Sequence, residues 1–196
     1  LPQHPLKSDL VKDARALARS VNEKAPAEQV SASAQQLRRK IITAYQVTVS
    51  PRKVPDTPRA EVLYRQLCAQ CHGATGHGDG PEGRSLNPKP ANFHDAARMG
   101  QRSVYGLYNT IYLGVAGTGM AGYPQLTDDE RWSLAFFVSN LRTPAERLEL
   151  GRKLWEKRDF HGAVPNLATL ATLTTNEVVI NHGDNTRAVF AYLRAE

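Results

Sequence analysis

The sequence of 196 residues has only two cysteines and two methionines, which limits the chemistry that it can support. Two cysteines cannot supply the four ligands of a usual structural zinc site, and no second Cys/His pair stands at zinc-finger spacing. No apolar run approaches the roughly 20 residues needed to cross a bilayer. The glycines form no phosphate-binding loop, and no Ser/His/Asp arrangement indicates a hydrolase. We therefore predict no transmembrane segment and no catalytic residues.

The chain starts at Leu1 and shows neither the basic region nor the apolar stretch of a signal peptide. We interpret it as a mature or excised segment whose targeting signal is missing from this sequence. The chain is long for one small domain and short for two large ones. We therefore expect a core domain with a smaller accessory unit.

The net charge of +6 is concentrated in the N-terminal segment. Residues 1–58 carry ten Lys/Arg and five Asp/Glu, whereas residues 59–196 carry fifteen and fourteen. This excess is typical of a surface that docks on an acidic partner or an anionic membrane. The solvated face of a helix is the simpler interpretation. No aromatic or Gly-rich recognition motif accompanies the charge, so we expect no nucleic-acid partner.

Both cysteines lie in one motif, in which Cys68 and Cys71 are followed directly by His72. A thioredoxin-like redox pair has the same spacing but usually lies beside a βαβ pattern, which this sequence lacks. The spacing also allows two thiols to add to the vinyl groups of haem while the following His ligates the iron. One helical turn carries both sulfurs to the vinyl edge. We therefore predict one covalently bound haem c, attached through Cys68 and Cys71, with His72 as an axial iron ligand.

The residues around this motif predict how the haem is enclosed. Residues 58–70 have the apolar spacing of a helix, and residues 73–81 are dense in glycine, as in a loop that wraps around a flat ligand. Pro88 and Pro90 follow. The carbonyl of either proline could accept a hydrogen bond from Nδ1 of His72 and so fix the tautomer of the ring. Stiffening of the loop is the simpler interpretation of both prolines.

The second axial ligand of an electron-carrying haem is usually Met or His. Met120 lies in a glycine-broken loop, residues 114–124, between two predicted helices. Met99 precedes a predicted helix and could equally be a packing residue. His77 and His94 lie in polar turns near the attachment motif, where we expect them to be solvated. We therefore predict Met120 as the second axial ligand.

The segment after this loop predicts the last helix of the domain. Thr127 and Glu130 have the spacing of a capping box, and apolar residues as far as Leu141 occupy one broad face. Trp132 lies on that face, where core packing is the simplest account of it. This helix can pack on the one that leads to Cys68 and close the fold around the haem.

Residues from about 60 to 141 resemble a class I cytochrome c domain, and more narrowly the cytochrome domains attached to bacterial high-affinity iron permeases. The segments that carry the narrower resemblance are 68–73, 78–81, 86–88, 92–93, 117–120 and 131–136. The resemblance implies an all-α class I cytochrome c fold in the periplasm or on the periplasmic face of the inner membrane. It also implies redox partner proteins, for which the basic N-terminal segment suggests acidic surfaces, and a membrane iron permease, with the domain accepting an electron as ferrous iron is oxidised.

The flanks of this domain are predicted to be helical as well. Residues 8–24 and 27–46 have amphipathic spacing and should form an αα-hairpin. Capping-box patterns at 143–146 and 174–177 should start two later helices, and a last helix covers about 185–194. The predicted order is an N-terminal helical hairpin at 1–50, a Pro-rich linker at 51–58, a class I cytochrome c domain at 59–142 and a C-terminal helical extension at 143–196.

We predict from these features a monohaem electron carrier and not an enzyme. With His72 and Met120 on the iron, no coordination position stays open, so electrons would cross the haem edge by outer-sphere transfer. The alternatives are a ligand-binding or peroxidase-like haem with a displaced Met, and a cytochrome subunit of another respiratory complex. A further alternative is an interaction module built on the basic hairpin. It predicts that removal of residues 1–55 weakens partner binding in a salt-dependent manner.

Overall fold

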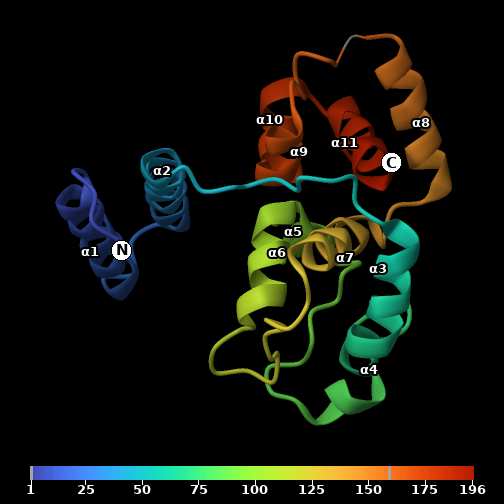
Figure 1. The fold of residues 1–196 in the computed structure, drawn as a ribbon, viewed down its shortest axis with the longest axis horizontal. Coiled ribbons are helices and arrows are strands. Elements are labelled where there is room, and N and C mark those ends of the chain that lie inside the picture. Colours follow the sequence, from blue (N-terminus) through green and yellow to red (C-terminus); the bar gives the residue numbers. More distant parts are fainter. Residues whose placement is uncertain (1, 159) are drawn as a thin grey trace. The chain divides into compact units, whose positions relative to one another are not determined.

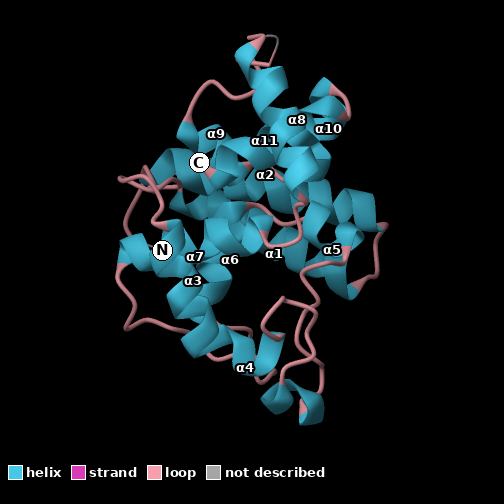
Figure 2. Cartoon of the chain, turned by 90° about the vertical axis from the view of Figure 1, so that its right-hand side faces the viewer, coloured by secondary structure: helices cyan, strands magenta, loops and turns pink. Residues whose placement is uncertain are grey.

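The computed structural model describes residues 2–158 and 160–196, and every regular element of this part is a helix (Figures 1 and 2). The prediction of an all-α fold is confirmed. The chain divides into two compact units, residues 1–49 and residues 50–196. None of the helices described combines the length and the apolar character needed to cross a membrane.

Two helices, α1 (Lys7–Asn22) and α2 (Ala27–Tyr45), form the smaller unit. A turn separates them, with Lys24 at a positive φ of 54°. Pro26 follows as the residue before α2. Both helices lie within a residue or two of the ranges predicted from the apolar spacing.

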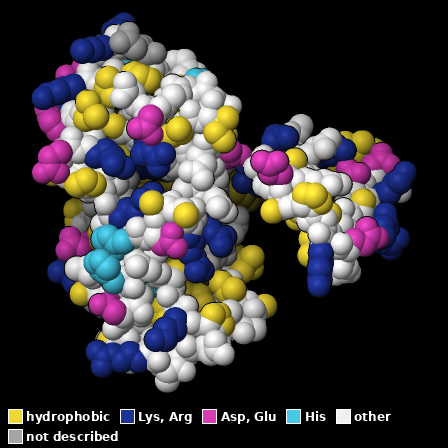
Figure 3. Space-filling view, turned by 180° about the vertical axis from the view of Figure 1, so that it is seen from behind, with side chains coloured by type: hydrophobic (Ala, Val, Ile, Leu, Met, Phe, Trp, Pro, Cys, Tyr) yellow, Lys and Arg dark blue, Asp and Glu magenta, His cyan; other side chains and the backbone are white. Residues whose placement is uncertain are grey.

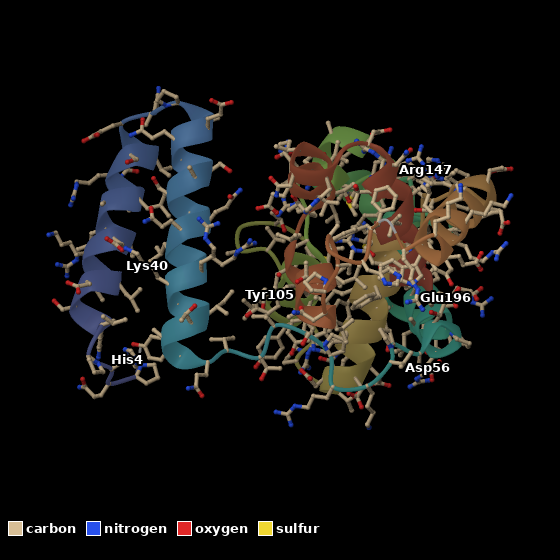
Figure 4. All side chains as sticks on the ribbon, turned by 90° about the horizontal axis from the view of Figure 1, so that it is seen from above. His4, Lys40, Asp56, Tyr105, Arg147 and Glu196 are labelled. Carbon is tan, nitrogen blue, oxygen red and sulfur yellow. The ribbon has the colours of Figure 1, made fainter. Side chains whose placement is uncertain are left out.

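An ion pair joins the two helices of the smaller unit. Lys40 on α2 is labelled in Figure 4, and its Nζ lies 2.7 Å from the carboxylate of Asp13 on α1. Of its hydrophobic side chains, Leu10 and Leu37 are buried. This unit therefore has a small core and leaves most of its charged side chains in solvent.

The larger unit contains a longer series of helices. The elements in chain order are α3 (Thr57–Leu63), the π-helical segment η1 (Tyr64–Cys68), α4 (Ala69–His72), the 3₁₀ segment η2 (Pro81–Ser85), α5 (Ala96–Gly100), α6 (Val104–Leu113), α7 (Asp128–Asn140), α8 (Ala145–Glu156), α9 (Leu167–Thr172), α10 (Thr175–His182) and α11 (Asn185–Ala195).

Helix α7 lies at the centre of the larger unit and packs against both α3 and α6 (Figure 1). Its residues Trp132, Leu134 and Phe136 are almost fully buried, as are Ala60 and Tyr64 on the facing helical stretch. Trp132 is therefore a core residue, in agreement with the sequence analysis. This core holds the start of the α3 stretch firmly against α7.

Polar contacts add to the packing between α3 and α7. The backbone N–H of Asp56 donates to Oγ of Ser133 at 2.9 Å, and the guanidinium of Arg59 lies 2.7 Å from the carboxylate of Glu130. Glu130 also completes the predicted capping box with Thr127. The helix that leads to the attachment motif is thus fixed at its N-terminal end.

The C-terminal helices pack on the same core. Phe190 of α11 and Val178 of α10 are fully buried within it. Helices α8 and α11 approach closely at Gly151, where an added Cβ would lie 2.1 Å from the carbonyl oxygen of Ala188. Residues 143–196 therefore complete the larger unit instead of forming a separate body.

Helix α10 begins where the sequence predicts. Oγ1 of Thr174 accepts the backbone N–H of Glu177, and the Glu177 carboxylate accepts the N–H of Thr174. Gly183 follows the helix with a φ of 83°, a conformation that glycine adopts without steric cost.

The capping box predicted for Thr143 and Glu146 is wrong. Helix α8 begins at Ala145, after Pro144, and has no side-chain cap. The hydroxyl of Thr143 donates instead to Oδ1 of Asn140, at the end of the preceding helix. A side chain engaged by α7 is not free to cap α8.

Candidate haem-binding site

The attachment motif lies at the end of the helical stretch that begins after Asp56. The Asp56 carboxylate accepts the backbone N–H of Arg59 and so caps the stretch. The stretch becomes π-helical in η1, which ends at Cys68, and the single turn of α4 carries Cys71 and His72. Segments of π-helix often occur at functional sites. The irregular turn therefore coincides with the three residues singled out by the sequence.

The two cysteines are not joined by a disulfide, and both are half-buried. Burial, followed by the nearby Cys71, raises the pKa of the Cys68 thiol to about 12. Reactive redox cysteines have a lowered pKa, so this environment disfavours a thioredoxin-like role. Two thiols one helical turn apart, followed directly by an imidazole, are a donor set that fits covalently attached haem c.

The ring of His72 is held in place by two neighbours. Its Nδ1 lies 3.1 Å from the carbonyl oxygen of Ala91. Because a carbonyl can only accept, Nδ1 carries the proton and Nε2 keeps the lone pair that a metal needs. The ring also stacks on Phe93, with centroids 4.6 Å apart. Burial lowers the pKa of His72, which favours the neutral, ligating form, although the bond to Ala91 opposes this shift.

This contact corrects the role predicted for Pro88 and Pro90. The carbonyl that meets His72 belongs to Ala91, the residue after Pro90. The carbonyl of Pro90 lies against the backbone of Gly78, where an added Cβ would be 2.7 Å away. The prolines therefore shape the chain beside the contact, and neither of them makes it.

The glycine-rich loop after His72 folds back on the attachment turn. Gly73 follows α4 with a φ of 80°, and a side chain there would collide with the carboxylate of Asp79. The N–H of Gly78 then donates to the carbonyl of His72 at 2.8 Å. The loop thereby covers the C-terminal end of the turn that bears His72.

Met120 is half-buried in the loop between α6 and α7, and hydrogen bonds fix its backbone. Its carbonyl accepts the N–H of Val115 at 2.9 Å, and its N–H donates to the hydroxyl of Thr118 at 3.1 Å. Met99, in contrast, lies in α5 with 6% of its surface exposed and packs in the core. Met99 is therefore a packing residue, and the role of Met120 as a ligand stays a prediction.

Two tyrosines that the sequence analysis missed tie these segments together. The hydroxyl of Tyr123 donates to the carbonyl of Leu67 at 2.9 Å. This bond joins the Met120 loop to η1, the segment that ends at Cys68. The buried hydroxyl of Tyr64 donates to the carbonyl of Gly73 at 2.9 Å. The Tyr123 contact spans 56 residues, and no local pattern signals it.

His77 and His94 stack on each other at the surface, with ring centroids 3.8 Å apart. Nε2 of His94 lies 2.8 Å from the carbonyl of Thr75, and Nδ1 of His77 lies 2.9 Å from its hydroxyl. Each ring thus has one nitrogen already engaged by Thr75. In the part of the chain that the structure describes, no group of three or more His, Cys, Asp or Glu side chains could hold a metal ion.

The match to a protein family agrees with this donor set. Residues 59–142 match the family model of cytochrome c. A thiosulfate dehydrogenase of Thiomonas intermedia (strain K12) is 25% identical over 116 residues, which are 57% of this chain and 35% of that protein. The chain thus spans about a third of the length of this relative. A chain of the Kuenenia stuttgartiensis reducing HAO-like protein complex is 26% identical with a TM-score of 0.38, and the match covers 56% of this chain and 61% of that one.

Proposed function

We propose that this c-type cytochrome domain, which carries covalently bound haem c and acts in electron transfer, passes single electrons by outer-sphere transfer. When bound, the haem iron supplies one-electron chemistry by changing between its ferric and ferrous states. Cys68 and Cys71 would hold the haem through thioether bonds, while His72 and Met120 would take the two axial positions. The observation that carries the proposal is the attachment turn, where the contact of Nδ1 with the Ala91 carbonyl fixes the tautomer of His72 directly after the two cysteines.

The surroundings of His72 support a permanent axial ligand. The hydrogen bond from Nδ1 to Ala91 fixes the tautomer and makes Nε2 a better electron donor. Phe93 restricts rotation of the ring by stacking on it. Both contacts come from the same short segment, so a single loop orients the ligand.

A sulfur ligand from Met120 would close the second axial position. No coordination site would then be open to a substrate or a gas, and the Met/His pair would raise the reduction potential. The hydrogen bonds of Met120 to Val115 and Thr118 support this role, because they present the side chain from an ordered backbone.

Replacement of Met120 in the holoprotein tests the closed site. We expect wild type and the control Met99→Leu to show the methionine-to-ferric-iron band near the red edge of the visible spectrum. Met120→Ala should lose the band, bind CO in its reduced form and have a lower potential. A band that survives in Met120→Ala would contradict the ligand assignment. Ready CO binding by wild type would contradict the carrier function and favour a ligand-binding or peroxidase-like haem.

We further propose that the protein acts in the periplasm or on the periplasmic face of the inner membrane, with ferrous iron as its electron source and an iron permease as its membrane partner. The support is the resemblance to permease-attached cytochrome domains, and the basic residues 1–49 would suit an acidic redox partner. Rapid mixing of the ferric holoprotein with ferrous iron should reduce the haem. Failure of this reduction in the presence of a permease-bearing membrane would contradict the iron link.

A second candidate electron source is thiosulfate, which the 25% identity to a thiosulfate dehydrogenase favours. The chain spans only about a third of that relative, so the catalytic part could be one with no counterpart in this chain. Addition of thiosulfate and an artificial electron acceptor to the holoprotein separates the two candidates. Catalytic turnover would identify an enzyme or a subunit of one, whereas reduction by ferrous iron alone would favour the iron-linked carrier.

A further inference from the structure

Four arginines surround a small cavity where the end of α7 meets α8, α10 and α11. The cavity has a volume of about 30 Å³ and opens to solvent beside the exposed Arg147, so a bound group could extend out of it. Its charged lining consists of Arg142, Arg147, Arg187 and Arg194. On the larger unit, Figure 3 shows dark blue Lys and Arg side chains gathered between the upper and lower halves. Positive charge therefore collects where residues 143–196 join the rest of the unit.

These positive charges have little acidic compensation. Within the described residues, Arg142 and Arg147 form no ion pair, and no acidic residue lines the cavity. Arg187 pairs with Asp184 at 3.2 Å, but the Asp184 side chain is 83% exposed. Exposed pairs of this kind contribute little. The cavity therefore has an excess of positive charge.

The excess of positive charge in the cavity is unfavourable at Arg142. Arg142 is half-buried, and its burial, then the charges of Arg187 and Arg147, lower the pKa of its guanidinium. Asp95 opposes the shift as the weakest of these causes. Like charges in a partly desolvated place repel each other. A bound anion would relieve this repulsion.

The groups that would hold the anion are those whose N–H groups are not already engaged in hydrogen bonds. Nδ2 of Asn140 already donates to the carbonyl of Ala191, and the guanidinium of Arg194 already donates to backbone carbonyls. Arg142 and Arg147 make no side-chain hydrogen bond among the described residues. Their free N–H groups form planar forks that match the oxygens of phosphate or sulfate. In Figure 4, Arg147 lies beside the C-terminal helices.

We propose that this cavity is a binding site for a small divalent oxyanion of the sulfate or phosphate class. Arg142 comes from the connection after α7, Arg147 from α8 and Arg187 from α11, so the anion would bridge residues 59–142 to the C-terminal helices. The site is independent of the haem ligands, and it goes beyond electron transfer. Its occupation stabilises the docked position of the C-terminal helices.

Calorimetric titration of the full-length holoprotein with sulfate tests the site, with chloride used to keep the ionic strength constant. We expect saturable binding to one site in wild type. Arg142→Gln and Arg147→Gln should each weaken it at least tenfold. Arg147 is exposed, so Arg147→Gln keeps the fold even if Arg142→Gln does not. The matched control is Arg39→Gln, which removes an exposed arginine from the smaller unit and should bind sulfate as wild type does.

Thermal unfolding gives a second test, in which the effect of Arg147→Gln on stability depends on whether sulfate is present. Without sulfate, Arg147→Gln should unfold at the same or a higher temperature than wild type, because it relieves repulsion. With sulfate, wild type and Arg39→Gln should gain more than Arg147→Gln. Sulfate also stabilises proteins in general, and Arg39→Gln measures that part. Equal gains in all three proteins, or no saturable binding by wild type, would overturn the proposal.

Discussion

Residues 59–142 and residues 143–196 share one core but differ in the polar groups that they bury. Among the described residues, the first region buries the hydroxyls of Ser103 and Ser133, and each bonds to the backbone of its own helix. The second region buries two threonine hydroxyls as well, but it also buries the guanidinium of Arg194. A hydroxyl is satisfied locally, whereas a buried guanidinium needs several carbonyls at once. The two regions thus differ in one respect, because only the second adds a buried arginine to its buried hydroxyls.

The shared core makes the two regions depend on each other. Phe190 and Val178 from the second region belong to the same cluster as Tyr64 and Trp132 from the first. Loss of packing in the C-terminal helices should therefore reach the helix that carries the attachment motif. The two regions differ in chemistry, and we expect them to unfold together.

Phe190→Ala is the strongest test of this dependence. Phe190 is fully buried, and removal of such a ring costs about 4 kcal/mol of unfolding free energy. Melting followed by far-UV circular dichroism and by haem absorbance should shift together. Ile180→Ala removes a side chain that is 82% exposed and should change stability by less than about 0.5 kcal/mol. A haem-monitored transition that stays in place while the helices melt earlier would break the link between the regions.

Arg194→Met tests how the second region satisfies its buried charge. The guanidinium donates to the carbonyls of Leu170 and Leu173, and burial lowers its pKa to about 10. The substitution removes a buried charge whose desolvation is unfavourable, but it also takes away the guanidinium N–H groups that donate to both carbonyls. We expect a net loss of about 2 kcal/mol in urea unfolding. The control Arg152→Met removes a partly exposed arginine from α8 and should cost clearly less.

The attachment site was predictable because its geometry is local. Cys68, Cys71 and His72 lie within about one turn, so the spacing alone brings them together. The contact between His72 and Ala91 spans 19 residues and depends on the path of the intervening loop. The sequence thus indicates that a carbonyl could meet His72 and offers those of Pro88 and Pro90, whereas the structure places the carbonyl of Ala91 there.

The same distinction applies to the C-terminal helices. The capping box at Thr174 involves four consecutive residues, and the prediction is confirmed. At Thr143 the same pattern failed because Asn140, from the previous helix, engages the hydroxyl. The arginine cavity draws its lining from four helices and the connection after α7, and no pattern within one segment indicates it. The division of the chain at 50, 58 and 142 stays a prediction.

The smallest expected effect concerns Glu130, which joins α7 to the helix leading to Cys68. One carboxylate oxygen accepts the guanidinium of Arg59, and the other accepts the N–H of Thr127. The bond from Arg59, followed by the N–H of Thr127, lowers the pKa of Glu130 below its ordinary value of 4.5. The folded state therefore holds the proton less tightly than the unfolded state does. The stabilisation by the ionised Glu130 carboxylate is complete above its ordinary pKa of 4.5. It is lost as the pH falls through the lower pKa that Glu130 has in the folded state.

Glu130→Gln should therefore cost about 1 kcal/mol at neutral pH, and the difference from wild type should vanish at acid pH. The measurement is urea unfolding of the holoprotein at a series of pH values. Glu61→Gln is the matched control, because Glu61 forms only an exposed pair with Arg65 at 3.5 Å. If both variants show the same pH dependence, the contact contributes no more than a surface ion pair. A difference confined to Glu130→Gln would mean that an ionised carboxylate helps to hold the helix leading to Cys68 in the first region, whereas the second region buries the guanidinium of Arg194.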